Sequence, residues 1–565
     1  MLRFLRLVFA LLLAQVLLWV LCFLVIGAAT SAWQASPAVE SGSVLWVQLQ
    51  GEIIEYPTLP RVPFVRHRPL SQTAILEALD EAARDDRITA VLVDLDDPWI
   101  GWGKASELHE AILRFRKSRK QVLAFAPELD ELGLYVASAC DSIFLPPTGK
   151  LYLDGLGVGP MYFRGALDKL GIHPNISRIG PYKDATEPEL RTNMSRESRE
   201  QFDWLLDGIW TEFLETVSSS RNLGRADLEE ALEEGILQPD EAVDRGFADG
   251  VGYREAIVTR FMDDINDTRL VPVMDYHRSM HRRHSGQTIA MVHALGLILR
   301  GRNQYNPAVG TILGSGSVVR DLEAAAADDH VAAIVLRVDS PGGEIIASDI
   351  ISSAVERARS RKPVVVSMVD VAASGGYMIS FRANKLVALP TTLTGSIGSF
   401  TGKLNMRGLY NKLGLTRDFV TRGSFPFLQS DYHDWSAAEE SLIARQQWED
   451  YERWVQGIAD TRKLKPDLVG ELGGGRVWTG QQALEHGLID ELGGESTAIQ
   501  VAQELAGIPE GARPRIVHYP EEKSFLAVLL EEGDLIFSSV VANWVHSLRL
   551  PRAGAWSVLD LRFLP

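Results

Sequence analysis

The fold is indicated by two stretches of the sequence that read alike, Ile88-Thr-Ala-Val-Leu-Val-Asp-Leu-Asp-Asp-Pro98 and Val331-Ala-Ala-Ile-Val-Leu-Arg-Val-Asp-Ser-Pro341. They lie 243 residues apart, counted from Ile88 to Val331. Each is a short apolar run, rich in β-branched residues and closed by turn residues, which is typical of a buried parallel strand. Apolar runs also follow at residues 122–125 and 364–368, so each stretch predicts the first of two neighbouring strands.

Further segments repeat in the same order and at nearly the same spacing. The matched pairs are 44–51 with 289–296, 168–172 with 411–415, and 242–249 with 483–490. Four ordered matches predict two copies of one unit, which we call unit 1 and unit 2. Helical patterns at 105–118 and 347–360 lie between the predicted strands of each copy. This alternation predicts an α/β fold in which helices cover a mostly parallel sheet.

The repeat and its flanks divide the chain into five predicted parts. These are residues 1–32, a cytoplasmic N-terminus and transmembrane anchor; 41–257, unit 1; 258–286, a linker; 287–508, unit 2; and 509–565, a C-terminal tail. The linker carries the basic run His277-Arg-Ser-Met-His281-Arg-Arg-His284. Its spacing matches no familiar set of metal ligands, which favours a solvated linker over a metal site.

The N-terminal segment predicts a membrane anchor. Residues 7–29 contain one polar side chain, Gln15, and about 20 apolar residues span a bilayer as a helix. Arg3 and Arg6 precede the run, and the next charged residue is Glu40. This asymmetry predicts a cytoplasmic N-terminus with the rest of the chain across the membrane. The alternative is a cleaved signal peptide, but the apolar core of such a peptide is usually shorter.

Composition excludes several classes of protein. The chain has 565 residues and a formal net charge of −17, which disfavours nucleic acid as a partner. Its 46% hydrophobic residues are too many for a disordered chain. The two cysteines, Cys22 and Cys140, exclude a disulfide scaffold, because Cys22 lies in the apolar N-terminal run.

The two copies differ where chemistry is expected. In unit 2 the strand at 331–340 ends in Asp339-Ser-Pro-Gly-Gly343, whereas unit 1 has Asp96-Asp-Pro-Trp-Ile100. The next strand of unit 2 runs into Ala373-Ser-Gly-Gly-Tyr377, and aligning the tyrosines places Leu132 of unit 1 opposite Ser374. A serine at a strand-to-helix turn followed by glycines is a suitable nucleophile, because helical N–H groups lie beside it. A plain tight turn is the alternative for this motif taken alone.

A lysine supplies the candidate base. Unit 1 reads Arg178-Ile-Gly-Pro-Tyr-Lys183, and at the repeat spacing Lys183 faces Pro426 of unit 2. Unit 1 therefore keeps a lysine and lacks the serine, while unit 2 keeps the serine and lacks the lysine. One composite Ser–Lys site explains both differences, although a solvated surface lysine is the ordinary reading of any single lysine.

Five motifs together resemble a known family. They are Tyr182-Lys-Asp-Ala-Thr-Glu-Pro188, Asp339-Ser-Pro-Gly-Gly343, Ala373-Ser-Gly-Gly-Tyr377, Leu393-Thr-Gly-Ser-Ile-Gly398 and Arg476-Val-Trp-Thr-Gly480. This order resembles the long, two-domain form of signal peptide peptidase A, or protease IV, over nearly the whole chain to about residue 506. One departure is Asp339, where some relatives carry asparagine.

The resemblance implies a tandem pair of Clp protease/crotonase-like units and a serine endopeptidase with a Ser–Lys dyad. It implies Ser374 as nucleophile, Lys183 as general base and Ser396 as the hydroxyl that orients the lysine. Gly343 and Gly375 would supply the oxyanion hole, with no metal or cofactor.

The resemblance also implies a biological setting. The chain would be a homotetramer anchored in the bacterial inner membrane by a single N-terminal helix, with its catalytic part on the periplasmic side. It would degrade cleaved signal peptides and other unfolded apolar peptides. Two alternatives remain: a crotonase-type acyl-CoA enzyme, and a catalytically inactive membrane scaffold of the same fold.

Overall fold

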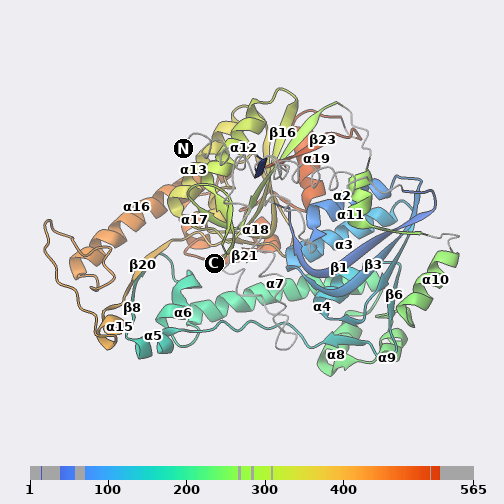
Figure 1. Cartoon of the computed structure of the whole chain (residues 1–565), viewed down its shortest axis with the longest axis horizontal. Coiled ribbons are helices and arrows are strands. Elements are labelled where there is room, and N and C mark those ends of the chain that lie inside the picture. The colour runs from blue at the N-terminus through green and yellow to red at the C-terminus, as the bar shows by residue number, and fades with distance from the viewer. Residues whose placement is uncertain are drawn as a thin grey trace.

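The computed structural model describes residues 39–57, 70–264, 269–280, 286–306, 309–509 and 511–521, together with residues 14 and 15. Two α/β units lie side by side, and an arm extends from them at the left of Figure 1. Apart from residues 14 and 15, the predicted anchor at 1–32 lies outside the described residues. Among the described residues, no helix is long and apolar enough to cross a bilayer.

Each unit is built on one parallel sheet, and the two sheets have the same strand order. The first contains, in spatial order, β10 (Gly250–Val251), β6 (Ser142–Leu145), β4 (Gln121–Phe125), β3 (Ile88–Trp99), β1 (Ser43–Ile54) and β11 (Arg269–Pro272), with β2 (Leu70–Ser71) beside β1. The second contains β22 (Glu491–Leu492), β18 (Lys385–Ala388), β17 (Val364–Ala373), β16 (Val331–Ser340), β12 (Thr288–Leu295) and β23 (Arg515–Tyr519). This shared topology confirms the predicted tandem repeat.

Short strands extend the carboxyl ends of the sheets. In unit 1 these are β5 (Glu128–Leu129), β7 (Lys150–Leu153) and β9 (Gly235–Leu237). In unit 2, β19 (Leu393–Gly395) pairs with the end of β17, and β21 (Val477–Thr479) pairs antiparallel with β19. Unit 2 also has a small sheet of β13 (Leu297–Leu299), β14 (Gln304–Asn306) and β15 (Gly310–Gly314). The extra pairing at the end of β17 lies beside the predicted nucleophile, because Ser374 follows that strand directly.

Helices cover both faces of each sheet. In unit 1 they are α2 (Gln72–Ala82), α3 (Trp102–Arg116), α4 (Glu131–Ala137), α10 (Arg254–Asp264) and α11 (Val273–Ser279); in unit 2, α12 (Ser315–Ala327), α13 (Ile345–Arg359), α14 (Gly375–Met378) and α19 (Glu495–Leu505). The sequence spacing explains their packing. In α3, Ala105, Leu108, Ala111, Ile112 and Phe115 recur at three- and four-residue steps, and all are buried against the sheet.

The remaining elements also occur in matched pairs. They are β8 (His173–Arg178) with β20 (Phe400–Asn405), α5 (Arg164–Leu170) with α15 (Arg407–Lys412), α7 (Arg196–Arg221) with α16 (Ala437–Arg462), α8 (Arg225–Glu234) with α17 (Pro466–Leu472), and α9 (Pro239–Asp244) with α18 (Gly480–Glu485); η1 (Asp184–Thr186) and α6 (Glu187–Leu190) lie between β8 and α7. Strands β8 and β20 pair antiparallel in the arm, so the two halves of the chain are joined there (Figure 1).

Two predicted boundaries differ from the structure. The predicted linker at 258–286 contains β11, which pairs parallel with β1, and α11, whose His277 is hydrogen-bonded to Glu77 of α2 at 2.7 Å. The predicted tail at 509–565 contributes β23, which pairs parallel with β12. Each edge strand is short and follows no strong apolar alternation, so tertiary pairing creates a strand where the local pattern gives little signal.

Candidate active site

Ser374 occupies a strained turn between strand and helix. It follows β17, caps α14 and has φ 55° and ψ −116°. A positive φ is rare for a residue with a Cβ and marks a turn that the surrounding structure holds in place. Here the Ser374 N–H donates to the carbonyl of Gly395 on β19 at 2.9 Å. The predicted seat of a nucleophile is therefore present, half-buried at the end of the sheet.

Lys183 reaches Ser374 from the other half of the chain. Its Nζ lies 2.9 Å from Ser374 Oγ, although the two residues are 191 positions apart. The lysine is only 2% exposed. Burial lowers the pKa of Lys183 to about 7, and the charge of the neighbouring Asp184 opposes that shift only in part. A substantial fraction of this amine is then neutral near pH 7 and able to accept a proton.

Ser396 holds the amine from the opposite side. Lys183 Nζ lies 2.7 Å from Ser396 Oγ and 3.0 Å from the Ser396 carbonyl oxygen. Ser396 is 1% exposed and has φ 50°, and its N–H donates to the carbonyl of Arg476 at 2.6 Å. Ser374 and Ser396 together surround Nζ with three polar contacts, and the structure thus places Ser396 beside the lysine it was predicted to orient.

The lysine loop is seated on glycines of unit 2. An ideal Cβ on Gly475 would lie 2.3 Å from Lys183 N, and Gly475 has φ +86°. The Tyr182 N–H donates to the carbonyl of Gly474 at 3.1 Å. From α7, Gln201 donates to Tyr182 and to Asp184, and accepts from the N–H of Val477 on β21. These contacts bring a lysine from unit 1 to a serine of unit 2.

The two predicted oxyanion glycines lie together beside the serine. An ideal Cβ on Gly375 would be 3.0 Å from Gly343 N, and one on Gly342 would be 2.6 Å from Gly375 N. Among the described residues, neither the Gly343 nor the Gly375 N–H donates to a backbone acceptor in the turns and loops. Both amides thus lie close to Ser374, where the sequence predicts the oxyanion hole.

The matching positions differ between the units as follows. Helix α4, which corresponds to α14, is capped by Asp130, whose carboxylate accepts from the Gly133 N–H at 2.7 Å. Leu132, the predicted counterpart of Ser374, lies in the first turn of α4 and is partly buried against the core of unit 1. Pro426, the predicted counterpart of Lys183, is exposed in the arm.

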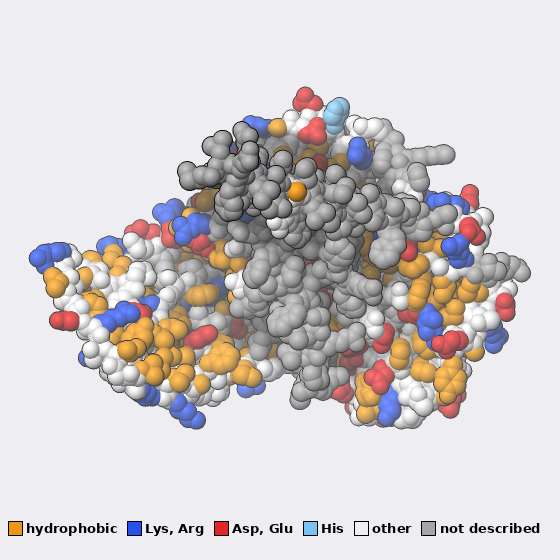
Figure 2. Space-filling view, in the orientation of Figure 1, with side chains coloured by type: hydrophobic (Ala, Val, Ile, Leu, Met, Phe, Trp, Pro, Cys, Tyr) orange, Lys and Arg blue, Asp and Glu red, His pale blue; other side chains and the backbone are white. Residues whose placement is uncertain are grey.

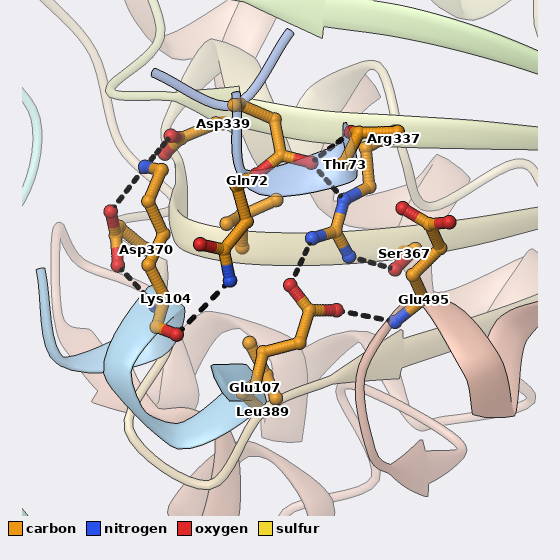
Figure 3. Close-up of polar contacts among 12 residues, drawn as sticks. Gln72, Thr73, Lys104, Glu107, Arg337, Asp339, Ser367, Asp370, Leu389 and Glu495 are labelled. Carbon is orange, nitrogen blue, oxygen red and sulfur yellow. Dashed lines mark hydrogen bonds and ion pairs between the residues drawn. The ribbon is translucent and has the colours of Figure 1, made fainter. Parts of the chain in front are cut away.

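Some residues near the site were not predicted. Lys104 of α3 forms buried ion pairs with Asp339 and Asp370 of unit 2, as Figure 3 shows. A signal for Asp370 exists in the sequence, since a carboxylate inside the apolar run 364–373 requires a buried partner. Nothing local identifies Lys104 as that partner. Among the described residues, no group of three or more His, Cys, Asp or Glu side chains could hold a metal ion.

The family model described as Peptidase family S49 matches the chain twice, at residues 114–267 and 356–509. The chain belongs to peptidase family S49. The two matches of the S49 model fall one in each half of the tandem fold, and together they contain Lys183, Ser374 and Ser396.

Curated relatives in this family are similar over most of the chain. The chloroplastic serine protease SPPA of Arabidopsis thaliana is 30% identical over 508 residues, covering 88% of this chain and 74% of that protein. Protease 4 of Salmonella typhi is 31% identical, covering 81% of this chain and 75% of that protein. Protease 4 of Haemophilus influenzae is 30% identical, covering 78% and 73%.

Solved structures match single portions of the S49 chain. A ClpP1 mutant from Listeria monocytogenes covers 38% of this chain and 94% of its own length, with 14% identity and a TM-score of 0.24. The tandem α/β fold is shown by the repeated strand order and by the double match of the family model.

Proposed function

We propose that this S49 chain is a serine endopeptidase in which Ser374 and Lys183 form a catalytic dyad. The observation that carries the proposal is the 2.9 Å contact between Lys183 Nζ and Ser374 Oγ, made by a buried lysine that has no carboxylate within hydrogen-bonding distance in the described residues. Such an amine is neutral at a lower pH than an ordinary lysine and is a competent base.

The proposed reaction follows from these positions. Neutral Lys183 takes the proton of Ser374 as Oγ attacks the peptide carbonyl, and the carbonyl oxygen receives the N–H groups of Gly343 and Gly375. Lys183 then returns the proton to the leaving amine. In the second half, the same lysine activates the water that hydrolyses the acyl-enzyme, and Ser396 keeps its amine directed at the reacting centre.

Labelling with an alkyl fluorophosphonate tests the dyad. The full chain is expected to be labelled at one serine, and Ser374→Ala and Lys183→Ala are each expected to remove the label. Ser353→Ala, an exposed serine on α13, is the matched control and should label like the wild type. Undiminished labelling of a folded Ser374→Ala protein would refute the proposal.

We further propose that the substrates are cleaved signal peptides and other unfolded apolar peptides, met at the periplasmic face of the bacterial inner membrane. The support is the apolar run at 7–29, which would hold the site near a bilayer, and the names of the relatives. Mass spectrometry of the membrane fraction should recover the N-terminal segment, and an apolar reporter peptide should be cleaved far faster than a folded, charged protein.

A homotetramer is proposed as the working assembly. Figure 2 shows apolar side chains gathered over the arm. Exposed members of this surface are Phe163, Leu170, Phe400, Leu404, Leu413, Leu415 and Phe425. A solvent-exposed apolar surface of this kind is typical of a subunit interface. Native mass spectrometry of the wild type and of Leu413→Asp tests it: four copies are expected for the first and fewer for the second.

A further inference from the structure

The N-terminus of α3 enters unit 2 and contacts the strands that lead into the active site. Gly101, at the cap of α3, has no side chain to bond the first turn. The carboxylate of Asp370 on β17 takes that role across the unit boundary, accepting from the Lys104 N–H at 2.8 Å. A helix of unit 1 is thus capped by a residue of unit 2.

The side chain of Lys104 extends the same contact to a second strand. Its Nζ donates to Asp370 at 2.5 Å and to Asp339 on β16 at 2.6 Å. Figure 3 shows the ammonium between the two carboxylates. Burial alone lowers the pKa of Lys104, but the charges of Asp339 and Asp370 outweigh burial and raise the pKa overall, so this lysine is a permanent cation.

The two carboxylates stand at the point where the sheet gives way to the active site. Between β16 and β17, Val338 pairs with Met368 and Ser340 pairs with Ala372, so Asp339 alone faces the three residues 369–371. Such a bulge redirects the strand that follows it. The Asp339 carboxylate also accepts from the Val371 N–H at 3.2 Å. Gly343 follows Asp339 by four positions, as Ser374 follows Asp370.

The packing around this contact leaves no room for adjustment. An ideal Cβ on Gly103 would lie 2.5 Å from the Val369 carbonyl oxygen, and one on Gly101 would lie 2.4 Å from Asp370. A second cluster of buried charged residues adjoins the contact of Lys104 with Asp339 and Asp370. In this cluster Arg337 donates to Glu55 and Glu107, and Glu107 accepts from the Glu495 N–H. Glu55, whose charge also acts on Lys104, is thus paired with Arg337 through one of its carboxylate oxygens.

We propose that Lys104 is a positioning residue: from unit 1 it ties together the two strand ends of unit 2 that carry Gly343 and Ser374. The inference depends on the proposed dyad and extends it. If the two ends separate, the Gly343 N–H moves away from the carbonyl oxygen that Ser374 attacks, although neither catalytic group is altered.

Removing the ammonium has a specific electrostatic consequence. In Lys104→Met, two buried carboxylates face each other without a cation. Like charges in one site raise the pKa of one carboxyl, so a proton can replace the lysine when the pH falls. The variant is expected to be most impaired at high pH and to recover towards low pH. A loss of stability alone would not produce that profile in folded protein.

The experiment measures fluorophosphonate labelling rates and peptide kcat and KM from pH 6 to 8.5 for the full chain. Lys104→Met is expected to label about 10- to 100-fold more slowly than wild type at pH 8.5, with KM little changed, which is the size of effect seen for a misplaced oxyanion donor. The ratio of variant to wild type should rise as the pH falls. Taking the ratio cancels the titration of Lys183, which both proteins share.

A double variant supplies the rescue. Lys104→Met combined with Asp339→Asn leaves no like-charge pair, and the new amide can donate to Asp370. The double variant should fold, and at pH 8.5 it should be labelled faster than Lys104→Met but more slowly than wild type. The ratio of its labelling rate to that of wild type should stay constant across pH. Because the double variant does not bury two like charges together, it still tests the positioning role of Lys104 if the single variant does not fold.

Lys385→Met is the matched control, because it removes a half-exposed lysine of unit 2 that is paired with Asp490 of unit 2. A folded Lys104→Met protein with a constant ratio to wild type, or a double variant with wild-type kcat, overturns the positioning role. These outcomes differ from failure of the dyad itself, in which the wild type is not labelled at Ser374 at all.

Discussion

Replacing Lys183 with methionine should abolish activity and, near neutral pH, stabilise the protein. The side chain is 2% exposed and its Nζ is surrounded by the hydroxyls of Ser374 and Ser396 and one carbonyl oxygen. Methionine has a similar length and no charge, so it removes the buried amine without leaving a large cavity. The free energy of unfolding then reports the cost of burying the lysine.

The magnitude follows from the two pKa values. Burial holds the pKa of Lys183 to about 7, whereas a lysine in the unfolded chain titrates near ~10.4. Between these values the unfolded chain binds a proton that the native protein does not, so wild-type stability rises with pH. The slope of about 1.4 kcal/mol per pH unit accumulates to about 4 kcal/mol from pH 7 to 10. The methionine variant lacks this contribution.

At pH 7 and below, the variant avoids the unfavourable free energy of burying the Lys183 amine, which is about 5 kcal/mol. The variant also loses the hydrogen bonds to Ser396, which lowers its stability by about 1–3 kcal/mol. The net gain in its free energy of unfolding is therefore a few kcal/mol. As the pH rises to 10 the gain should vanish or reverse. The difference between the two proteins is therefore more informative than either stability alone, because all other titrating groups cancel.

Urea unfolding followed by tryptophan fluorescence at pH 7, 8, 9 and 10 measures this difference. Lys385→Met is the control for loss of a lysine as such. In parallel, the wild-type labelling rate should climb about tenfold per pH unit below pH 7 and level off above it, because only the neutral amine accepts the proton. A stability difference that does not change with pH, together with a labelling rate that is flat from pH 6 to 9, would refute a depressed pKa for Lys183.

Three further outcomes are expected. The double variant Lys183→Ala/Ser374→Ala should be no less active in peptide cleavage than either single variant, since residues of one catalytic unit are strongly non-additive. Ser396→Ala should lower kcat about tenfold or more with little change in KM, because general-base catalysis depends on a directed amine, and steady-state kinetics on an apolar peptide measure it. Gly475→Ala should lower kcat sharply, since its Cβ would lie 2.3 Å from Lys183 N, whereas Gly470→Ala on α17, where the space is open, should not.

The repeated fold was readable from the sequence because its signals are local. The runs at 88–98 and 331–341 became β3 and β16, paired to the same neighbours in each sheet. The edge strands β11 and β23 were not predicted, since each has one strand neighbour in its sheet and a short run carries little pattern. Edge strands of this kind are selected by the partner, and only the folded sheet supplies it.

The sequence likewise indicated some residues of the candidate site and missed others, depending on whether a local signal marks them. Ser374 and Lys183 stood out because the two copies differ there, and comparison of repeats exposes such differences. Leu132, aligned with Ser374 by the repeat, lies on α4, which is longer than α14 and begins after Asp130. Lys104 gave no signal, because a lysine in the first turn of a helix is ordinary until the partner strand is in place.

The division of the proposed dyad between two units has a structural consequence. The lysine loop of unit 1 rests on Gly474 and Gly475 of unit 2, while the strand end that carries Ser374 is tied to Lys104 of unit 1. Each unit thus holds in place the proposed catalytic residue of the other. A change that weakens the contacts between the units should displace the proposed base and nucleophile together, so activity should fall before either sheet unfolds. Proteolytic activity in this architecture is a property of the docked pair, and the buried charges at the boundary are where that dependence is built in.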